Sequence, residues 1–146
     1  MKKIILLCAF ALTTIAALPQ GQAVVATMKA SLTSSVDSVR SNGTTPVYLY
    51  MPNIKGQYTT AVFQATATRI SAAMAGTINM EGSLDGTNWY NASNAAGDTI
   101  TVANAATQTS RLRVLPTYGL PYYHYRLKII GTTNDTMTVR AKFGAR

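Results

Sequence analysis

Residues 76–90 read GTINMEGSLDGTNWY and form the clearest strand–turn–strand pattern in the chain. The pattern predicts a strand, a tight turn at Asp85-Gly86 and an aromatic residue, Trp89, at the start of the next strand. Aspartate bonds to the backbone ahead of it, and glycine takes the left-handed conformation that such a turn needs. Trp89 is the only tryptophan, and it is predicted to cover one end of the core. The turn and core motif consists of Gly82, Ser83, Asp85, Gly86 and Trp89.

Strand signals recur at roughly ten-residue intervals on both sides of this stretch, with turn residues between them. The pattern predicts an all-β fold, a single antiparallel β-sandwich of jelly-roll or immunoglobulin-like type with about eight strands. The predicted strands are Val24–Leu32, Val47–Met51, Thr59–Ile70, Gly76–Leu84, Thr99–Ala103, Thr109–Leu115, Tyr122–Ile130 and Thr136–Phe143.

One segment, Ala61–Met74, is rich in alanine and can also be written as a helix. Its valine, threonine and isoleucine residues are β-branched and lose side-chain freedom in a helix. They favour a strand that runs into a short alanine-rich loop.

The N-terminal segment, residues 1–23, has the pattern of a secretory signal peptide. Two lysines precede an apolar run, and small residues at Gly21 and Ala23 mark a cleavage site before Val24. A retained apolar arm is the alternative. The run is too short for a stable transmembrane span, which takes about 20 residues. The β-sandwich domain is then residues 24–146, and it contains no cysteine, because the one cysteine is Cys8. Cleavage would therefore exclude disulfides and thiolate chemistry, and it would place the protein outside the cytoplasm or on a virion surface.

The motif GSxDGxxW at residues 82–89 is followed by an aromatic–arginine element at residues 122–129, which reads YYHYRLKI. In this order the two elements resemble the β-sandwich domains of tailed-phage virion proteins of the decoration or tail type. They resemble discoidin-like carbohydrate-binding modules more weakly. The first resemblance implies a structural subunit and the second a glycan-binding module. Neither implies a catalytic residue.

Catalytic groups are scarce in the mature chain. Its only histidine is His124, in a predicted strand between tyrosines. Three of the aspartates lie in predicted turns, where they bond to the backbone. A pair of acid and base carboxylates would need Glu81 to meet one of these aspartates. We therefore expect no enzyme activity, no cofactor and no metal centre. A calcium ion bound by turn oxygens around Asp85 or Asp135 is the one alternative that the sequence leaves open.

The positive charge is concentrated at the C-terminal end. The chain carries a formal net charge of +8. Four bases and four acids cancel between residues 24 and 110, whereas residues 111–146 contain seven bases and one acid, a net of 7 − 1 = +6.

These bases occur in pairs two residues apart, which places each pair on one face of a strand. If residues 131–135 close a hairpin, Arg126 lies nearly opposite Arg140, an arrangement of like charges that is destabilising without an anionic partner. The pairs predict either a solvated face or a docking surface. The candidate partner-binding residues are Arg111, Arg113, Arg126, Lys128, Arg140 and Lys142.

Two functions follow from these patterns. The first is a non-enzymatic structural subunit at the surface of a virion, an extracellular filament or a cell envelope. It would dock through its basic C-terminal sheet onto copies of itself or onto neighbouring subunits with acidic surfaces. The alternative is a secreted carbohydrate-binding module for a neutral or anionic surface glycan. The export signal argues against nucleic acid as a partner.

Overall fold

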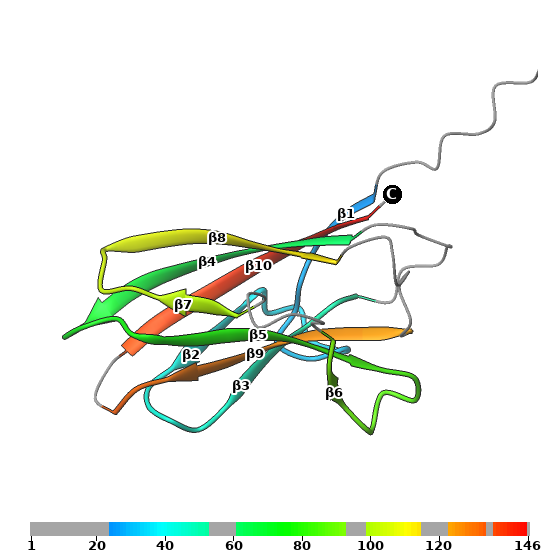
Figure 1. The fold of residues 1–146 in the computed structure, drawn as a ribbon, viewed down its shortest axis with the longest axis horizontal. Helices are drawn as coiled ribbons and strands as arrows, with labels where there is room; N and C mark the ends of the chain where they lie inside the picture. The colour runs from blue at the N-terminus through cyan, green and yellow to red at the C-terminus, as the bar shows by residue number, and fades with distance from the viewer. Residues whose placement is uncertain (1–23, 53–60, 93–98, 115–122, 134–135, 146) are drawn as a thin grey trace, which may run out of the picture.

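The computed structural model is a sandwich of two antiparallel β-sheets, and no helix occurs in the residues it describes (Figure 1). It describes residues 24–52, 61–92, 99–114, 123–133 and 136–145. The predicted signal segment, residues 1–23, lies outside these ranges. Among the described residues, no helix has the length and apolar character needed to span a bilayer.

Each sheet has five of the described strands. The strands of sheet A are β1 (Val24–Thr27), β2 (Ser38–Ser41), β4 (Ala61–Ser71), β8 (Thr107–Val114) and β10 (Thr136–Ala145). Those of sheet B are β3 (Val47–Tyr50), β5 (Gly76–Ser83), β6 (Tyr90–Asn91), β7 (Ile100–Val102) and β9 (His124–Gly131). In sheet A the order is β1-β10-β4-β8, and β2 also pairs with β10. In sheet B the order is β3-β9-β5-β6, and β7 also pairs with β5.

The prediction of an antiparallel β-sandwich is confirmed. Each of the eight predicted strands overlaps an observed one. Two short strands lie outside the eight predicted ranges: β2, which was missed, and β6, which begins one residue after Trp89, the residue predicted to start the strand after the turn. The alanine-rich segment is strand β4, paired along its length with β10 and β8. The residue after this strand, Ala72, has a φ of 53°, a left-handed conformation that ends the strand.

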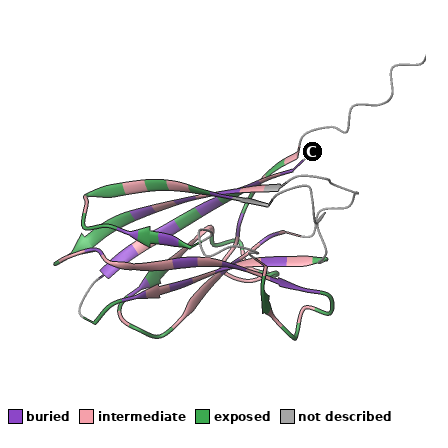
Figure 2. Ribbon diagram, in the orientation of Figure 1, coloured by how far each residue is buried: buried purple, intermediate pink, exposed green. Residues whose placement is uncertain are grey.

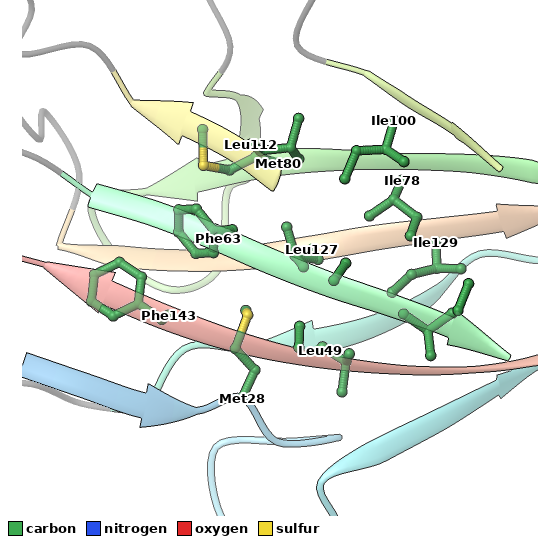
Figure 3. Packing of buried hydrophobic residues seen from close by; sticks show 14 of the residues in the cluster. Met28, Leu49, Phe63, Ile78, Met80, Ile100, Leu112, Leu127, Ile129 and Phe143 are labelled. Carbon is green, nitrogen blue, oxygen red and sulfur yellow. The ribbon is translucent and has the colours of Figure 1, made fainter. Parts of the chain in front are cut away.

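The core lies between the sheets and is built from alternate residues of each strand. In strand β9, half-buried and buried residues alternate along the whole length (Figure 2). Phe63 of β4 is fully buried, and its ring centroid lies 5.0 Å from that of Phe143 and 5.9 Å from that of Tyr125. Leu127 and Met28 pack in the same layer (Figure 3). Because alternate side chains fill this layer, the remaining ones form the two outer faces of the sandwich.

The predicted hairpin between the last two long strands does not form. Strand β9 pairs with β3 and β5 in sheet B, whereas β10 pairs with β1, β2 and β4 in sheet A. Arg126 therefore lies opposite Glu81 and Tyr50, and not opposite Arg140. The physical reason is burial: the apolar sides of β9 and β10 face each other across the core and cover each other there, which edge-to-edge pairing would not allow. The prediction that the basic pairs lie together on one sheet is therefore wrong.

Candidate functional site

The candidate site is a group of aromatic and charged side chains on the outer face of sheet B. They come from β3, β5 and β9 and from the connection before β6. We call this group the aromatic–charged cluster. It consists of Tyr48, Tyr50, Glu81, Trp89, Arg126 and Lys128.

The strand register brings the members of the cluster together. Arg126 is paired with Tyr50 on one side and with Glu81 on the other, so these three side chains form one row across the sheet. The next row contains Tyr48, Lys128 and Asn79. Residues directly opposite on one face have Cβ atoms about 4.5–5.5 Å apart, so the side chains of a row are in contact range.

Glu81 is the anionic centre of the cluster. The Nε of Arg126 donates to its Oε2 at 2.7 Å, and the Nη2 of Arg126 forms an ion pair with the same oxygen at 2.6 Å. The Nζ of Lys128 lies 3.5 Å from the other oxygen, Oε1. The side chains of Arg126 and Glu81 are only 13% and 12% exposed, so this pair is better shielded from water than an ordinary surface ion pair.

Aromatic rings enclose the guanidinium group of Arg126. Its central carbon lies 4.0 Å from the ring centroid of Tyr48 and 4.2 Å from that of Trp89, with Tyr50 further away at 5.9 Å. The rings of Tyr50 and Trp89 meet edge to face at 5.8 Å. Cation–π contacts of this kind hold a planar guanidinium flat against a ring. The cluster is therefore ordered by contacts among its own members.

The turn after β5 delivers Trp89 to this face. Gly86 has a φ of 74°, the left-handed conformation predicted for it. The Ser83 hydroxyl accepts from the Gly86 amide at 2.9 Å, and the indole Nε1 of Trp89 donates to the Gly86 carbonyl at 3.1 Å. The turn prediction is confirmed. The prediction that Trp89 covers one end of the core is wrong, because its ring lies on the outer face against Arg126.

Asp85 closes the same turn with its carboxylate. Oδ1 accepts from the amides of Thr87 and Asn88, both at 2.8 Å, and Oδ2 accepts from the Asn88 side chain. The hydrogen bonds from the Asn88 and Thr87 amides hold the pKa of Asp85 far below its ordinary value of 3.8.

We expect Asp85→Asn to lower the melting temperature at neutral pH, because the amide loses the charge that these donors favour. A carboxyl with a lowered folded-state pKa stabilises the fold above its unfolded pKa, and the contribution is lost as the pH falls below that value. The difference in melting temperature between Asp85→Asn and the wild type should therefore be constant above about pH 5 and shrink below pH 3.8. Thermal melts between pH 2 and pH 7 measure it. A difference that grows in acid would contradict this role of Asp85.

The described residues contain no group of three or more histidine, cysteine, aspartate or glutamate side chains placed to hold an ion. The carboxylate of Asp85 already accepts hydrogen bonds from the turn, and Asp135, the other residue named for a calcium ion, lies outside the described residues.

The six predicted partner-binding residues divide between two opposite faces. Arg126 and Lys128 belong to the cluster on sheet B. Arg140 and Lys142 of β10, with Arg111 of β8, are exposed on sheet A. Arg113 pairs with Val62 in the β4–β8 ladder, and its side chain lies outside the described part of the chain.

Sequence reasoning missed the two tyrosines of β3. The signal was present in Val47-Tyr48-Leu49-Tyr50, where the tyrosines alternate with the core-facing aliphatic residues, half-buried Val47 and buried Leu49, and so share the outer face. The tyrosines that did attract notice, at positions 122, 123 and 125, lie elsewhere. Tyr125 is 2% exposed in the core, Tyr123 is 78% exposed, and Tyr122 lies outside the described residues.

Comparison with known proteins gives similarities to solved structures alone. No protein-family model and no curated protein matches the chain. The chain is similar to a family 29 carbohydrate-binding module, with 10% identity over 85% of this chain and 89% of that one and a TM-score of 0.47. It is also similar to a mutant of the module CBM29-2, with 9% identity over 85% and 92% of the two chains and a TM-score of 0.45. A third is the C-terminal family 22 carbohydrate-binding module of Clostridium thermocellum Xyn10B, with 16% identity over 86% and 82% of the chains and a TM-score of 0.39. These similarities assign no ligand or activity to this chain.

Proposed function

We propose that this chain is an exported, non-enzymatic glycan-binding module whose ligand lies on the aromatic–charged cluster of sheet B. The observation that carries the proposal is the outward-facing guanidinium of Arg126, held between the rings of Tyr48 and Trp89 and paired with Glu81. A cluster of this kind combines flat apolar surfaces with fixed hydrogen-bonding groups on an outer face.

The aromatic rings suit the faces of sugar rings. A pyranose presents polarised C–H groups on its faces, and the electron-rich face of an aromatic ring attracts them. Tyr48, Tyr50 and Trp89 are half-buried, so parts of their rings remain accessible to a ligand. Aromatic residues contribute large contact area and lose little side-chain entropy on binding, because they have only two rotatable bonds.

The charged side chains suit the edges of sugar rings. A hydroxyl group both donates and accepts, so a vicinal pair of hydroxyls can bridge a guanidinium and a carboxylate. Among the contacts of the described residues, Nη1 of Arg126 has no acceptor, and Oε1 of Glu81 has only the 3.5 Å contact to Lys128. Lys128 is 31% exposed and adds a further donor. These groups are preorganised, which reduces the entropic cost of binding.

The test uses Trp89, because it is the only tryptophan and belongs to the cluster. Soluble neutral glucans, mannans and xylans are titrated against the protein while its tryptophan emission is followed. We expect a saturable change for at least one of these polymers. Tyr48→Ala should weaken that binding about two- to thirteenfold, since an aromatic contact contributes about 0.5–1.5 kcal/mol.

Tyr123→Ala is the matched control, because Tyr123 is a highly exposed tyrosine outside the cluster. It should bind as wild type does. Emission that no polymer in the panel changes would contradict the proposal. So would an equal loss of affinity in the two tyrosine variants.

The structural-subunit hypothesis from the sequence predicts a different behaviour in solution. Size-exclusion chromatography distinguishes the two: a strict monomer that binds a glycan excludes assembly, and an oligomer that binds none overturns the glycan proposal. Export is part of the proposal as well, and mass spectrometry of the native N-terminus should find a start at Val24.

A further inference from the structure

The outer face of sheet A carries a second concentration of positive charge, on the opposite side of the sandwich from the cluster. Four bases lie on it, all exposed: Arg40 of β2, Arg111 of β8, and Arg140 and Lys142 of β10. We call these four residues the basic stripe. Arg40 was not among the residues singled out from the sequence, because its strand β2 was missed.

The register places Arg40, Arg140 and Lys142 on a diagonal across β2 and β10, and it places Arg111 level with Lys142 on β8. Arg40 is paired with Thr138, two residues before Arg140 on the same face of β10. Lys142 is paired with Gln64, which is paired in turn with Arg111 two strands away. With about 3.4 Å per residue and about 4.8 Å between strands, neighbouring bases stand roughly 7–10 Å apart.

Little in the described chain neutralises the basic stripe. Asp37 lies 3.8 Å from Arg140, and these side chains are 48% and 70% exposed, so the contact contributes little. Arg40, Arg111 and Lys142 form no ion pair with a described carboxylate. Arg126 differs in being enclosed by Glu81 and aromatic rings. The field above sheet A is therefore positive and favours an anionic ligand.

Most described side chains between these bases are threonine, serine or glutamine, and Asp37 is the one described acid among them. Thr66 and Thr109 share a hydroxyl–hydroxyl bond of 3.0 Å on this face. A depression of about 390 Å³ on this face is lined by Arg140 and Lys142, by Thr27, Gln64 and Thr66, and by Asp37. Such a surface offers hydroxyl and amide groups beside its cations.

We propose that the basic stripe binds an anionic polysaccharide, a hydroxyl-rich polymer with repeating carboxylate or sulfate groups. The described outward positions of sheet A contain no aromatic side chain, whereas proteins that bind single-stranded nucleic acid stack bases on aromatic rings. Protein interfaces are likewise enriched in aromatic residues and methionine at their cores. On such a polymer, threonine and glutamine side chains can form hydrogen bonds with the sugar hydroxyls, while the spaced bases form ion pairs with the repeating anionic groups. This site is separate from the proposed glycan site on sheet B and does not depend on it.

Calorimetric titrations with polygalacturonate, heparin and neutral dextran test the proposal. The two acidic polymers separate carboxylate from sulfate as the preferred group, and binding of either one supports the proposal. At about 0.1 M salt we expect an acidic polymer to bind and dextran not to bind. At about 1 M salt binding should disappear, because the Debye length falls from about 10 Å to about 3 Å.

The variant Arg140→Gln/Lys142→Gln should weaken this binding about thirtyfold, since each basic side chain at an anionic surface contributes roughly a fivefold factor. The matched control is Lys29→Gln/Arg69→Gln, which removes the same net charge outside the stripe and should bind nearly as wild type does. Tyr48→Ala, the variant of the sheet B site, should also leave the affinity unchanged.

Three results would overturn the inference. The first is the absence of binding to either acidic polymer at the lower salt concentration. The second is an equal loss of affinity in the stripe and control variants, which would mean that the net charge of the protein, and not the basic stripe, determines the binding. The third is tighter binding of a DNA duplex than of either polysaccharide, which would make nucleic acid the ligand.

Discussion

Arg126→Met is expected to lower the free energy of unfolding by about 2–4 kcal/mol, because breaking a buried ion pair costs about 3–5 kcal/mol and this pair keeps some exposure. The variant leaves Glu81 shielded from water with Lys128 as its remaining cation, at 3.5 Å. It also removes the cation from between the rings of Tyr48 and Trp89. Urea unfolding at pH 7 measures the change.

Arg140→Met is the control for this prediction, because it makes the same substitution at an exposed arginine. Arg140 is 70% exposed and only loosely paired with Asp37, so its loss should cost less than about 1 kcal/mol. Equal costs at the two positions would show that the aromatic–charged cluster does not stabilise the fold. Arg126→Lys should fall between wild type and Arg126→Met, since lysine keeps the charge but has no planar group to lie against the rings.

The same variants connect stability with the proposed function. Arg126 contributes hydrogen-bond donors to the proposed glycan site and holds the aromatic rings in place. Under conditions in which Arg126→Met stays folded, we expect it to lose glycan binding. Arg140→Met lies on the other face and should retain it. A folded Arg126→Met protein that binds glycan as wild type does would place the ligand elsewhere.

Gly76→Ala is expected to destabilise the protein by about 3 kcal/mol or more, through overpacking and backbone strain together. Gly76 begins β5 and is paired with Gly131 of β9 and Val102 of β7. A Cβ atom there would meet the carbonyl oxygen of Ile130 and come within 3.0 Å of the Gly131 Cα. These are backbone atoms and cannot rotate away. The φ of Gly76, +154°, is also one that other residues rarely adopt.

Gly43→Ala separates the two contributions to this cost. Gly43 has a similar φ of +144°, but a Cβ there would have no atom within 4 Å. Its replacement should therefore cost the strain alone, about 1–2 kcal/mol. Chemical denaturation of both variants gives the comparison. Equal losses would mean that the contact with Ile130 relaxes at no cost.

Local rules accounted for the elements that sequence reasoning recovered. Strand β4 was recovered in spite of its alanines, because β-branched residues alternate along it. The turn at Asp85-Gly86 was recovered because its hydrogen bonds run between residues at most three positions apart. The two strands outside the predicted ranges are short: β2 has four residues and β6 has two. Strands β1, β3 and β7 are similar in length to β2 and were recovered, because each contains two or more aliphatic residues. β2 has one aliphatic residue and β6 has none, so no period of two can be recognised in them.

The candidate site was only partly predictable. Arg126 and Lys128 were singled out for their charge and Trp89 as part of the turn and core motif, but the contacts that join them to each other, to Glu81 and to the β3 tyrosines were not predicted. Glu81 precedes Arg126 by 45 positions in the sequence, and Tyr48 comes from a third strand. Contacts over such separations depend on strand pairing, which a single sequence does not specify.

The GTINMEGSLDGTNWY stretch shows where this division falls. The sequence by itself determined that the stretch is a strand with a turn at Asp85-Gly86, because alternation and turn chemistry are local properties. Only the tertiary structure decided that Trp89 lies on the outer face of sheet B, and that β9 and β10 belong to different sheets. An alternation with a period of two indicates which side chains share a face of a strand, but it does not indicate which other strand is its neighbour in the sheet. That choice depends on how the two apolar sheet faces cover each other.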